Sequence, residues 1–179
     1  MKGLPNATRS ARACAMASLA LLLHNPTGSE REPNIVQAAA EKLGRQLRVL
    51  NVSNDRELDA AFTIIREQRI GGLLVEGEAF FTSRREQLIL FTTRYAIPTV
   101  YAFRELTAAG GLMSYGASLS AAYRLMASYV AHILKGAKLA ELPVQQSTTL
   151  EMVVNLKAAK ALGITIPTGI LLRADEVIE

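Results

Sequence analysis

The sequence predicts an α/β fold, a three-layer sandwich in which helices cover both faces of a mostly parallel sheet. Two observations support this prediction. Short continuous apolar runs, typical of strands buried on both faces, alternate with stretches of helical periodicity. The connections between the runs are too long for hairpins, so successive strands should run parallel and be joined by crossover helices.

The first strand–helix units lie between residues 19 and 103. Residues 29–43 have apolar side chains at helical spacing, and Gly44 is placed to end this helix in the left-handed conformation. Asn54 with Glu57 matches the capping box that begins a helix, and Ser83 with Glu86 repeats that signature. The apolar runs that we predict as strands are residues 19–23, 47–52, 73–75 and 98–103.

The pattern changes after Phe103. A long amphipathic helix begins at Leu119, and Lys135 with Gly136 should end it. Asn155 is placed to cap a short helix that ends at Gly163. The remaining assignments are a loop or turn at residues 105–111, a brief strand at 112–114, a β-rich stretch at 148–154, and one more helical turn in the tail, 171–179.

Composition indicates a single globular domain. Half of the 179 residues are hydrophobic, and the net charge of +4 comes from lysines and arginines interleaved with acidic residues, which argues against a nucleic-acid partner. The single cysteine, Cys14, excludes an intramolecular disulfide. With only His24 and His132 beside it, we expect no His/Cys metal cluster.

No catalytic residues and no cofactor are predicted. Ser118 follows Gly116 but lacks the second glycine of a nucleophile elbow. The sequence has neither a dinucleotide fingerprint nor a phosphate loop. Glu76 and Glu78 form a carboxylate pair without the partner acid that glycoside hydrolysis requires.

The N-terminal segment resembles the first two regions of a signal peptide. Lys2, Arg9 and Arg12 precede an apolar run at residues 13–23, but no small-residue cleavage site follows. We expect residues 1–18 to be a leader or a disordered segment. Residues 19–179 should then form a single α/β domain.

Ligand binding is better supported than catalysis. Ligands of open parallel sheets lie outside the carboxyl ends of the strands. Backbone N–H groups and the Ser29 hydroxyl could hold a carboxylate, Glu78 or Glu76 an ammonium group, and Phe103 or Tyr115 could stack on an apolar group. Together they suit an amino-acid-like solute. The full predicted set of ligand-binding residues is Asn25, Ser29, Glu78, Phe103, Ser114, Tyr115 and Gly116.

Several segments in order resemble the C-terminal half of ABC transporter substrate-binding proteins, a family that includes binders of aromatic amino acids. They are Leu22-Leu-His-Asn-Pro-Thr27, Glu57-Leu-Asp-Ala-Ala-Phe62, Ile97-Pro-Thr-Val-Tyr101, Ala109-Gly-Gly-Leu-Met-Ser-Tyr-Gly116, Ile133-Leu-Lys-Gly136, Leu142-Pro-Val-Gln-Gln146, Val154-Asn-Leu-Lys157 and Arg173-Ala-Asp-Glu-Val-Ile-Glu179.

The resemblance implies a two-lobed receptor of the type I periplasmic fold, which closes on a small solute and presents it to an ABC permease. It also implies a periplasmic location, and that residues 19–179 are a single α/β solute-binding lobe with a C-terminal crossover segment. Asn25, Glu78 and the run Ser114-Tyr115-Gly116 match segments that line the cleft in the family. Gly77-Glu-Ala79 stands where family members have a Pro-Asp-Pro-like run.

Length is the main departure from the family. The first lobe should precede Leu19, where this chain has only eighteen residues. The helix at 119–135 would then lose its packing partner and could form a homodimer. Two other functions stay open: a truncated regulatory or association module, and a flavodoxin-like enzyme with an unrecognised site.

Overall fold

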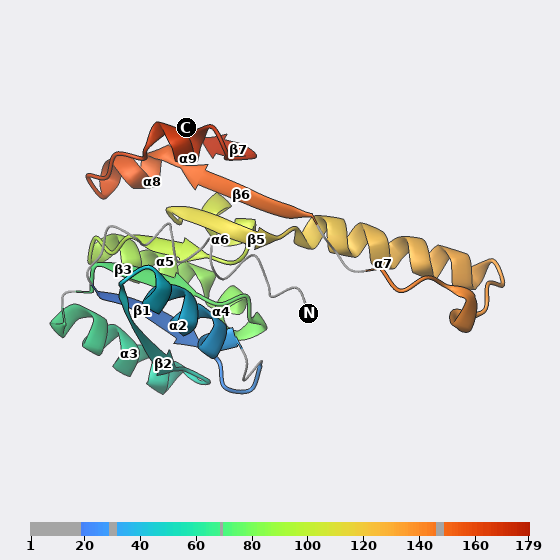
Figure 1. Cartoon of the computed structure of the whole chain (residues 1–179), viewed down its shortest axis with the longest axis horizontal. Coiled ribbons are helices and arrows are strands. Elements are labelled where there is room, and N and C mark those ends of the chain that lie inside the picture. The colour runs from blue at the N-terminus through green and yellow to red at the C-terminus, as the bar shows by residue number, and fades with distance from the viewer. Residues whose placement is uncertain (1–18, 29–31, 69, 146–148) are drawn as a thin grey trace.

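The computed structural model describes residues 19–28, 32–68, 70–145 and 149–179. Among these residues, seven strands form one sheet in the order β2-β1-β3-β4-β5-β6-β7 (Figure 1). The strands are β1 (Leu19–His24), β2 (Gln46–Asn51), β3 (Gly72–Val75), β4 (Thr99–Tyr101), β5 (Met113–Ala117), β6 (Leu150–Asn155) and β7 (Glu176–Ile178). The neighbouring strands from β2 to β5 are parallel, β6 is antiparallel to β5, and β7 is parallel to β6. The prediction of an α/β fold with a mostly parallel sheet is confirmed.

Helices cover both faces of the sheet. One face contacts α2 (Glu32–Lys42) and α8 (Leu156–Ala161), whose side chains join the cluster around Leu22 and Val154. The opposite face contacts α3 (Asp55–Glu67), α4 (Ala79–Ser83), α5 (Arg85–Arg94) and α6 (Arg104–Ala108). In β1, Leu21 and Leu23 belong to this second cluster, which explains why the strand reads as a continuous apolar run.

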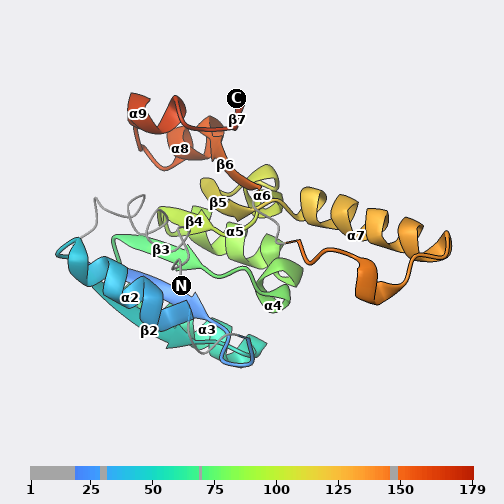
Figure 2. The ribbon, with the colours of Figure 1, turned by 45° about the vertical axis from the view of Figure 1, so that its right-hand side comes forward.

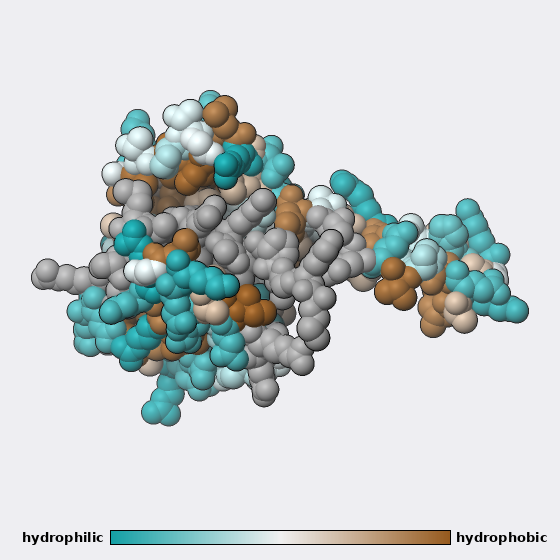
Figure 3. Space-filling model, viewed as in Figure 1, coloured by the Kyte–Doolittle hydropathy of each residue, from teal (hydrophilic) through white to brown (hydrophobic). Residues whose placement is uncertain are grey.

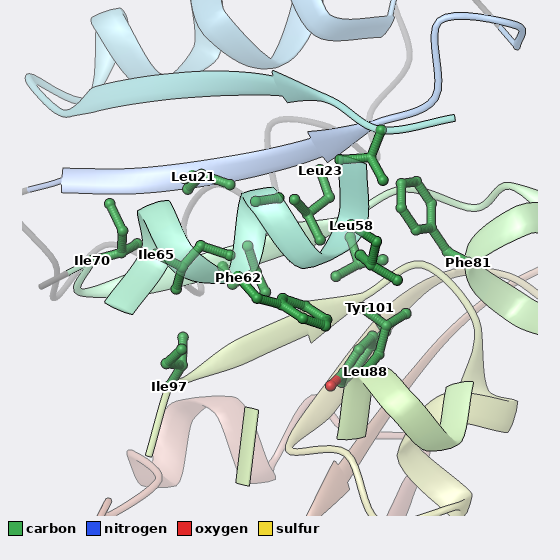
Figure 4. Close-up of a cluster of buried hydrophobic side chains, with 14 of the residues drawn as sticks. Leu21, Leu23, Leu58, Phe62, Ile65, Ile70, Phe81, Leu88, Ile97 and Tyr101 are labelled. Atoms are coloured by element: carbon green, nitrogen blue, oxygen red, sulfur yellow. The ribbon is translucent and has the colours of Figure 1, made fainter. Parts of the chain in front are cut away.

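The larger core cluster lies beneath α3, α4 and α5 (Figure 4). Leu58, Phe81 and Leu88 are fully buried in it. Tyr101 places its ring among them, and its hydroxyl lies 3.1 Å from the Thr92 Oγ1. Burial raises the pKa of Tyr101, so the hydroxyl stays protonated as a buried hydrogen-bonding group.

Two asparagine caps are confirmed. The Asn54 side chain accepts a hydrogen bond of 3.0 Å from the Glu57 N–H and so begins α3. The reciprocal bond of the capping box is displaced by one residue, because the Glu57 carboxylate accepts from the Ser53 N–H. Asn155 caps α8 in the same way, with a bond of 3.0 Å from the Ala158 N–H.

Three local predictions were wrong. Ser83 caps no helix: it is the last residue of α4, its hydroxyl donates to the Phe80 carbonyl, and Arg84 stands before α5. Residues 105–111 were predicted as a loop or turn, but residues 105–108 belong to α6 and only 109–111 follow it. The tail ends in β7, because its residues pair with β6 across the sheet and this pairing has no local sequence signal.

The long helix α7 (Leu119–Leu134) leaves the sheet after β5, and the chain returns through η1 (Leu139–Glu141) to β6. Figures 1 and 2 both show α7 projecting from the body. None of its residues is buried. The predicted ending is confirmed, since Gly136 has a φ of 95°. No helix within the described ranges is both long and apolar enough to cross a membrane. The predicted leader at 1–18 lies outside those ranges.

Candidate functional site

A cavity of about 210 Å³ lies at the carboxyl ends of β1, β3, β4 and β5. The four strands are parallel neighbours, so their carboxyl ends meet at one edge of the sheet, where ligands of open α/β sheets bind. The first residue of α2, Glu32, also lines the cavity. The cavity therefore combines the ends of four strands with the beginning of one helix.

Two aromatic residues line this cavity. Tyr115 is on β5 and is 7% exposed. Phe103 immediately precedes α6 and is half-buried. A Cβ on Gly77 would lie 2.9 Å from the Phe103 Cζ, so the chain after β3 passes directly against this ring. The two rings provide an apolar surface beside the polar end of the cavity.

Gly116 is required by the packing of β5. A Cβ at this position would lie 2.1 Å from the Ala102 carbonyl oxygen, closer than any side-chain carbon can come. The residue also lines the cavity. The absence of a side chain at Gly116 thus permits the close approach of β5 to the end of β4 and leaves this part of the cavity wall as backbone.

The polar end of the cavity contains the buried carboxylate of Glu76. Its Oε2 accepts a hydrogen bond of 2.6 Å from the His24 Nδ1 and a weaker one of 3.3 Å from the Asn25 N–H. Its Oε1 is buried and has no hydrogen-bond partner among the described residues. Burial raises the pKa of Glu76, while the bonds from His24 and Asn25 oppose this shift and the charge of Glu32 adds to it.

Two further carboxylates lie near Glu76. Glu32 keeps contact with solvent, but desolvation of its carboxylate by neighbouring atoms and the charge of Glu78 raise its pKa, with His24 opposing. The Glu78 side chain packs against the loop after β1, where a Cβ on Gly28 would lie 2.2 Å from its Oε1. Acidic groups therefore gather at this edge although the chain as a whole carries a net positive charge.

Only some of the predicted ligand-binding residues line the cavity. Phe103, Tyr115 and Gly116 line the cavity, and Glu78 lies beside it through its interaction with Glu32. Ser114 has a buried hydroxyl without a hydrogen-bond partner in the described part of the chain, but it does not line the cavity. Side chains alternate along a strand, so Ser114 faces away from the side that Tyr115 occupies.

Asn25 forms a turn instead of lining the cavity. Its Oδ1 accepts from the Thr27 N–H at 3.1 Å and from the Thr27 hydroxyl at 2.8 Å. Ser29 lies outside the described residues. Sequence reasoning missed His24 and Glu32 as members of the site. His24 is the last residue of β1, whereas the predicted strand ended at Leu23. A strand predicted one residue longer would have placed His24 at the carboxyl end, where ligands bind.

A larger cavity of about 450 Å³ lies at the opposite ends of the strands, between α5 and α8. Its polar side chains are largely used within the fold. Thr92 bonds to Tyr101, Thr99 bonds to the Ile97 carbonyl, and Asn155 both caps α8 and donates to the Thr107 carbonyl. The smaller cavity, where a buried carboxylate oxygen has no partner among the described residues, is therefore the candidate functional site.

Comparison with known proteins identifies the family of the chain. A family model described as ABC transporter substrate binding protein matches residues 21–178. No match was found among curated proteins.

Solved structures share the fold. An ABC domain from Streptococcus pneumoniae in complex with L-Trp superposes with a TM-score of 0.82 at 23% identity over 97% of this chain and 62% of that one. A conserved domain protein from Vibrio cholerae gives a TM-score of 0.83 at 23% identity over 97% and 60%. A ligand-free, open substrate binding protein with adhesive properties from Clostridium difficile gives 0.64 at 20% identity over 90% and 55%. This chain thus spans about three fifths of the length of the first two.

Proposed function

The chain belongs to the ABC transporter substrate binding protein family, and on that premise we propose that it is the solute-binding component of an ABC-type importer. It captures a small amino-acid-like solute and carries out no chemical conversion. The observation that supports this proposal best is the cavity at the strand ends, where Phe103 and Tyr115 stand beside the carboxylate of Glu76. Apolar and anionic groups together suit a solute with an ammonium group and a hydrophobic side chain.

The partner in this function is an ABC permease, and the place of action is the periplasm. In a two-lobed receptor, the lobe described here contributes one wall of the cleft, and a first lobe closes over the solute by a hinge motion. The match covers 62% and 60% of the structures from Streptococcus and Vibrio, so each of those chains has a further part outside the match. The permease would receive the solute from the closed receptor.

A thermal-shift screen against amino acids and small carboxylates tests the proposal. Aromatic amino acids should raise the melting temperature, because a ligand that binds only the folded state stabilises it by about 2.7 kcal/mol at 100 times its Kd. Tyr115→Ala and Glu78→Ala should abolish the shift, since they remove a cavity wall and a neighbouring carboxylate.

Two variants control for nonspecific effects. Tyr123→Ala removes a tyrosine that is 64% exposed on α7, and Glu67→Ala removes an exposed carboxylate at the end of α3. Both should retain the full shift. A flat response of the parent chain with a cooperative melt would contradict solute binding by this chain.

We also propose that this 179-residue chain forms a homodimer through α7. Tyr123, Met126, Val130 and Ile133 follow helical spacing on one face and are between 44% and 64% exposed. Figure 3 shows apolar residues gathered on this projecting segment. Burying such a face against a second copy removes apolar surface from water.

Sedimentation velocity tests this association. The parent chain should sediment as a dimer, and Val130→Lys should sediment as a monomer because it places a charge on the apolar face. Ser128→Lys is the matched control: it adds the same charge on the opposite face of α7, where Ser128 is exposed. A monomeric parent chain at micromolar concentration would contradict the proposal.

A further inference from the structure

The carboxylate of Glu76 lacks one hydrogen-bond donor. Its side chain is only 4% exposed, and its Oε2 is held by His24 and the Asn25 N–H. Its Oε1 has no partner within the described residues, although Glu76 lines the cavity. Leaving a buried carboxylate oxygen unsatisfied costs free energy, and a donor that enters the cavity would recover part of it.

The charges around the cavity favour a positively charged donor. Glu32 lines the same cavity, and the carboxylate of Glu78 is close enough to interact electrostatically with it. None of the described residues that line the cavity is a lysine or an arginine. The imidazole of His24 lies against the Oε2 of Glu76 and is itself buried. A carboxylate of a ligand would be repelled here, and a cation would be attracted.

The cavity suits an organic cation better than a metal ion. No group of three His, Cys, Asp or Glu side chains in the described part of the chain is arranged to hold a metal. Phe103 and Tyr115 instead provide aromatic rings, which attract ammonium groups and pack against apolar ones. The volume of about 210 Å³ lies below the range of roughly 300–1,000 Å³ usual for whole ligands. The cavity therefore fits one end of a solute.

We infer that this cavity binds the ammonium end of an aromatic primary amine, with the Oε1 of Glu76 accepting one of its N–H bonds. Glu32 and Glu78 supply the surrounding negative charge, and Phe103 and Tyr115 contact the aromatic group. This inference rests on the proposed solute-binding function. It adds that the lobe recognises the amine and does not need the ligand's carboxylate.

Three indole compounds separate these contributions: L-Trp has both groups, tryptamine has the amine alone, and indole-3-propionate has the carboxylate alone. Isothermal titration calorimetry with the 179-residue chain should detect binding of tryptamine and L-Trp. Indole-3-propionate should bind at least 10-fold more weakly than tryptamine, because it brings a negative charge and no donor for Glu76.

Glu76→Gln tests the acceptor directly and should weaken tryptamine binding by about 10-fold or more, because a charge-assisted hydrogen bond becomes a neutral one. Glu67→Gln is the matched control, with the same charge change at an exposed position of α3, and it should leave the affinity unchanged. Glu78→Gln provides a second test if Glu76→Gln does not fold, and it should weaken tryptamine binding through the lost negative charge.

Several results of these titrations would overturn the assignment of the cavity to an amine. Equal or tighter binding of indole-3-propionate would overturn it while leaving solute binding intact, as would binding of L-Trp without tryptamine. An equal loss in Glu67→Gln and Glu76→Gln would assign the effect to net charge and also overturn it. A chain that binds none of the three compounds contradicts the proposed function for aromatic amino-acid-like solutes, and the inference fails with it.

Discussion

Replacing Phe81 with alanine should lower the free energy of unfolding by about 3–5 kcal/mol, the range for truncating a buried phenylalanine. Phe81 is fully buried in α4 and packs in the cluster that includes Leu23, Leu58 and Tyr101 (Figure 4). The substitution removes the apolar area of the ring and leaves a cavity in a close-packed core. Urea unfolding followed by circular dichroism measures the change.

Leu90→Ala is the control for this experiment. Leu90 is in the neighbouring helix α5 and is 71% exposed, so its truncation should change the free energy by no more than about 0.5 kcal/mol. A loss below about 1 kcal/mol for Phe81→Ala would mean that the core beneath α4 is not packed as described. The same result would question the position of Glu78, which immediately precedes α4.

Gly116→Ala should destabilise the chain by about 1–3 kcal/mol, the cost of overpacking, and should also weaken solute binding. The added Cβ would lie 2.1 Å from the Ala102 carbonyl oxygen. Because the obstacle is backbone, β5 must move away from the end of β4, and the cavity wall formed by Tyr115 moves with it. Thermal unfolding and calorimetry with L-Trp measure the two effects.

Gly169→Ala is the matched control for Gly116→Ala. A Cβ at Gly169 meets no atom within 4 Å, and the residue lies in α9 (Thr168–Leu171). Alanine is the better helix former there, so stability should be unchanged or rise by up to about 1 kcal/mol. If Gly116→Ala behaved like Gly169→Ala, the close approach of β5 to Ala102 would be contradicted.

Much of the fold was predictable because its signals are local. The apolar runs of β1 and β3 identify strands buried on both faces, and Asn54 and Asn155 begin helices through bonds to residues three positions away. Gly44 and Gly136 end helices with positive φ as predicted. Each of these features depends on a few neighbouring residues and can be recognised without the rest of the chain.

The candidate site was predictable only in position. The rule that ligands lie at the carboxyl ends of parallel strands selected the edge of the sheet at which Phe103, Tyr115 and Gly116 line a cavity. It could not distinguish Tyr115 from Ser114, because which face of a strand meets a cavity depends on the helices packed against the sheet. Nor could it show that Asn25 uses its side chain for a turn with Thr27.

The sequence by itself determined the α/β class and the order of most elements, because apolar periodicity and caps are properties of neighbouring residues. Its ordered short segments also carried the resemblance to the family, which the family model matches. Only the tertiary structure decided that β6 runs antiparallel to β5, that the tail pairs as β7, and that His24 meets Glu76 across 52 positions of the chain. These contacts form when distant segments are brought together by burial of the core, and no local pattern encodes them.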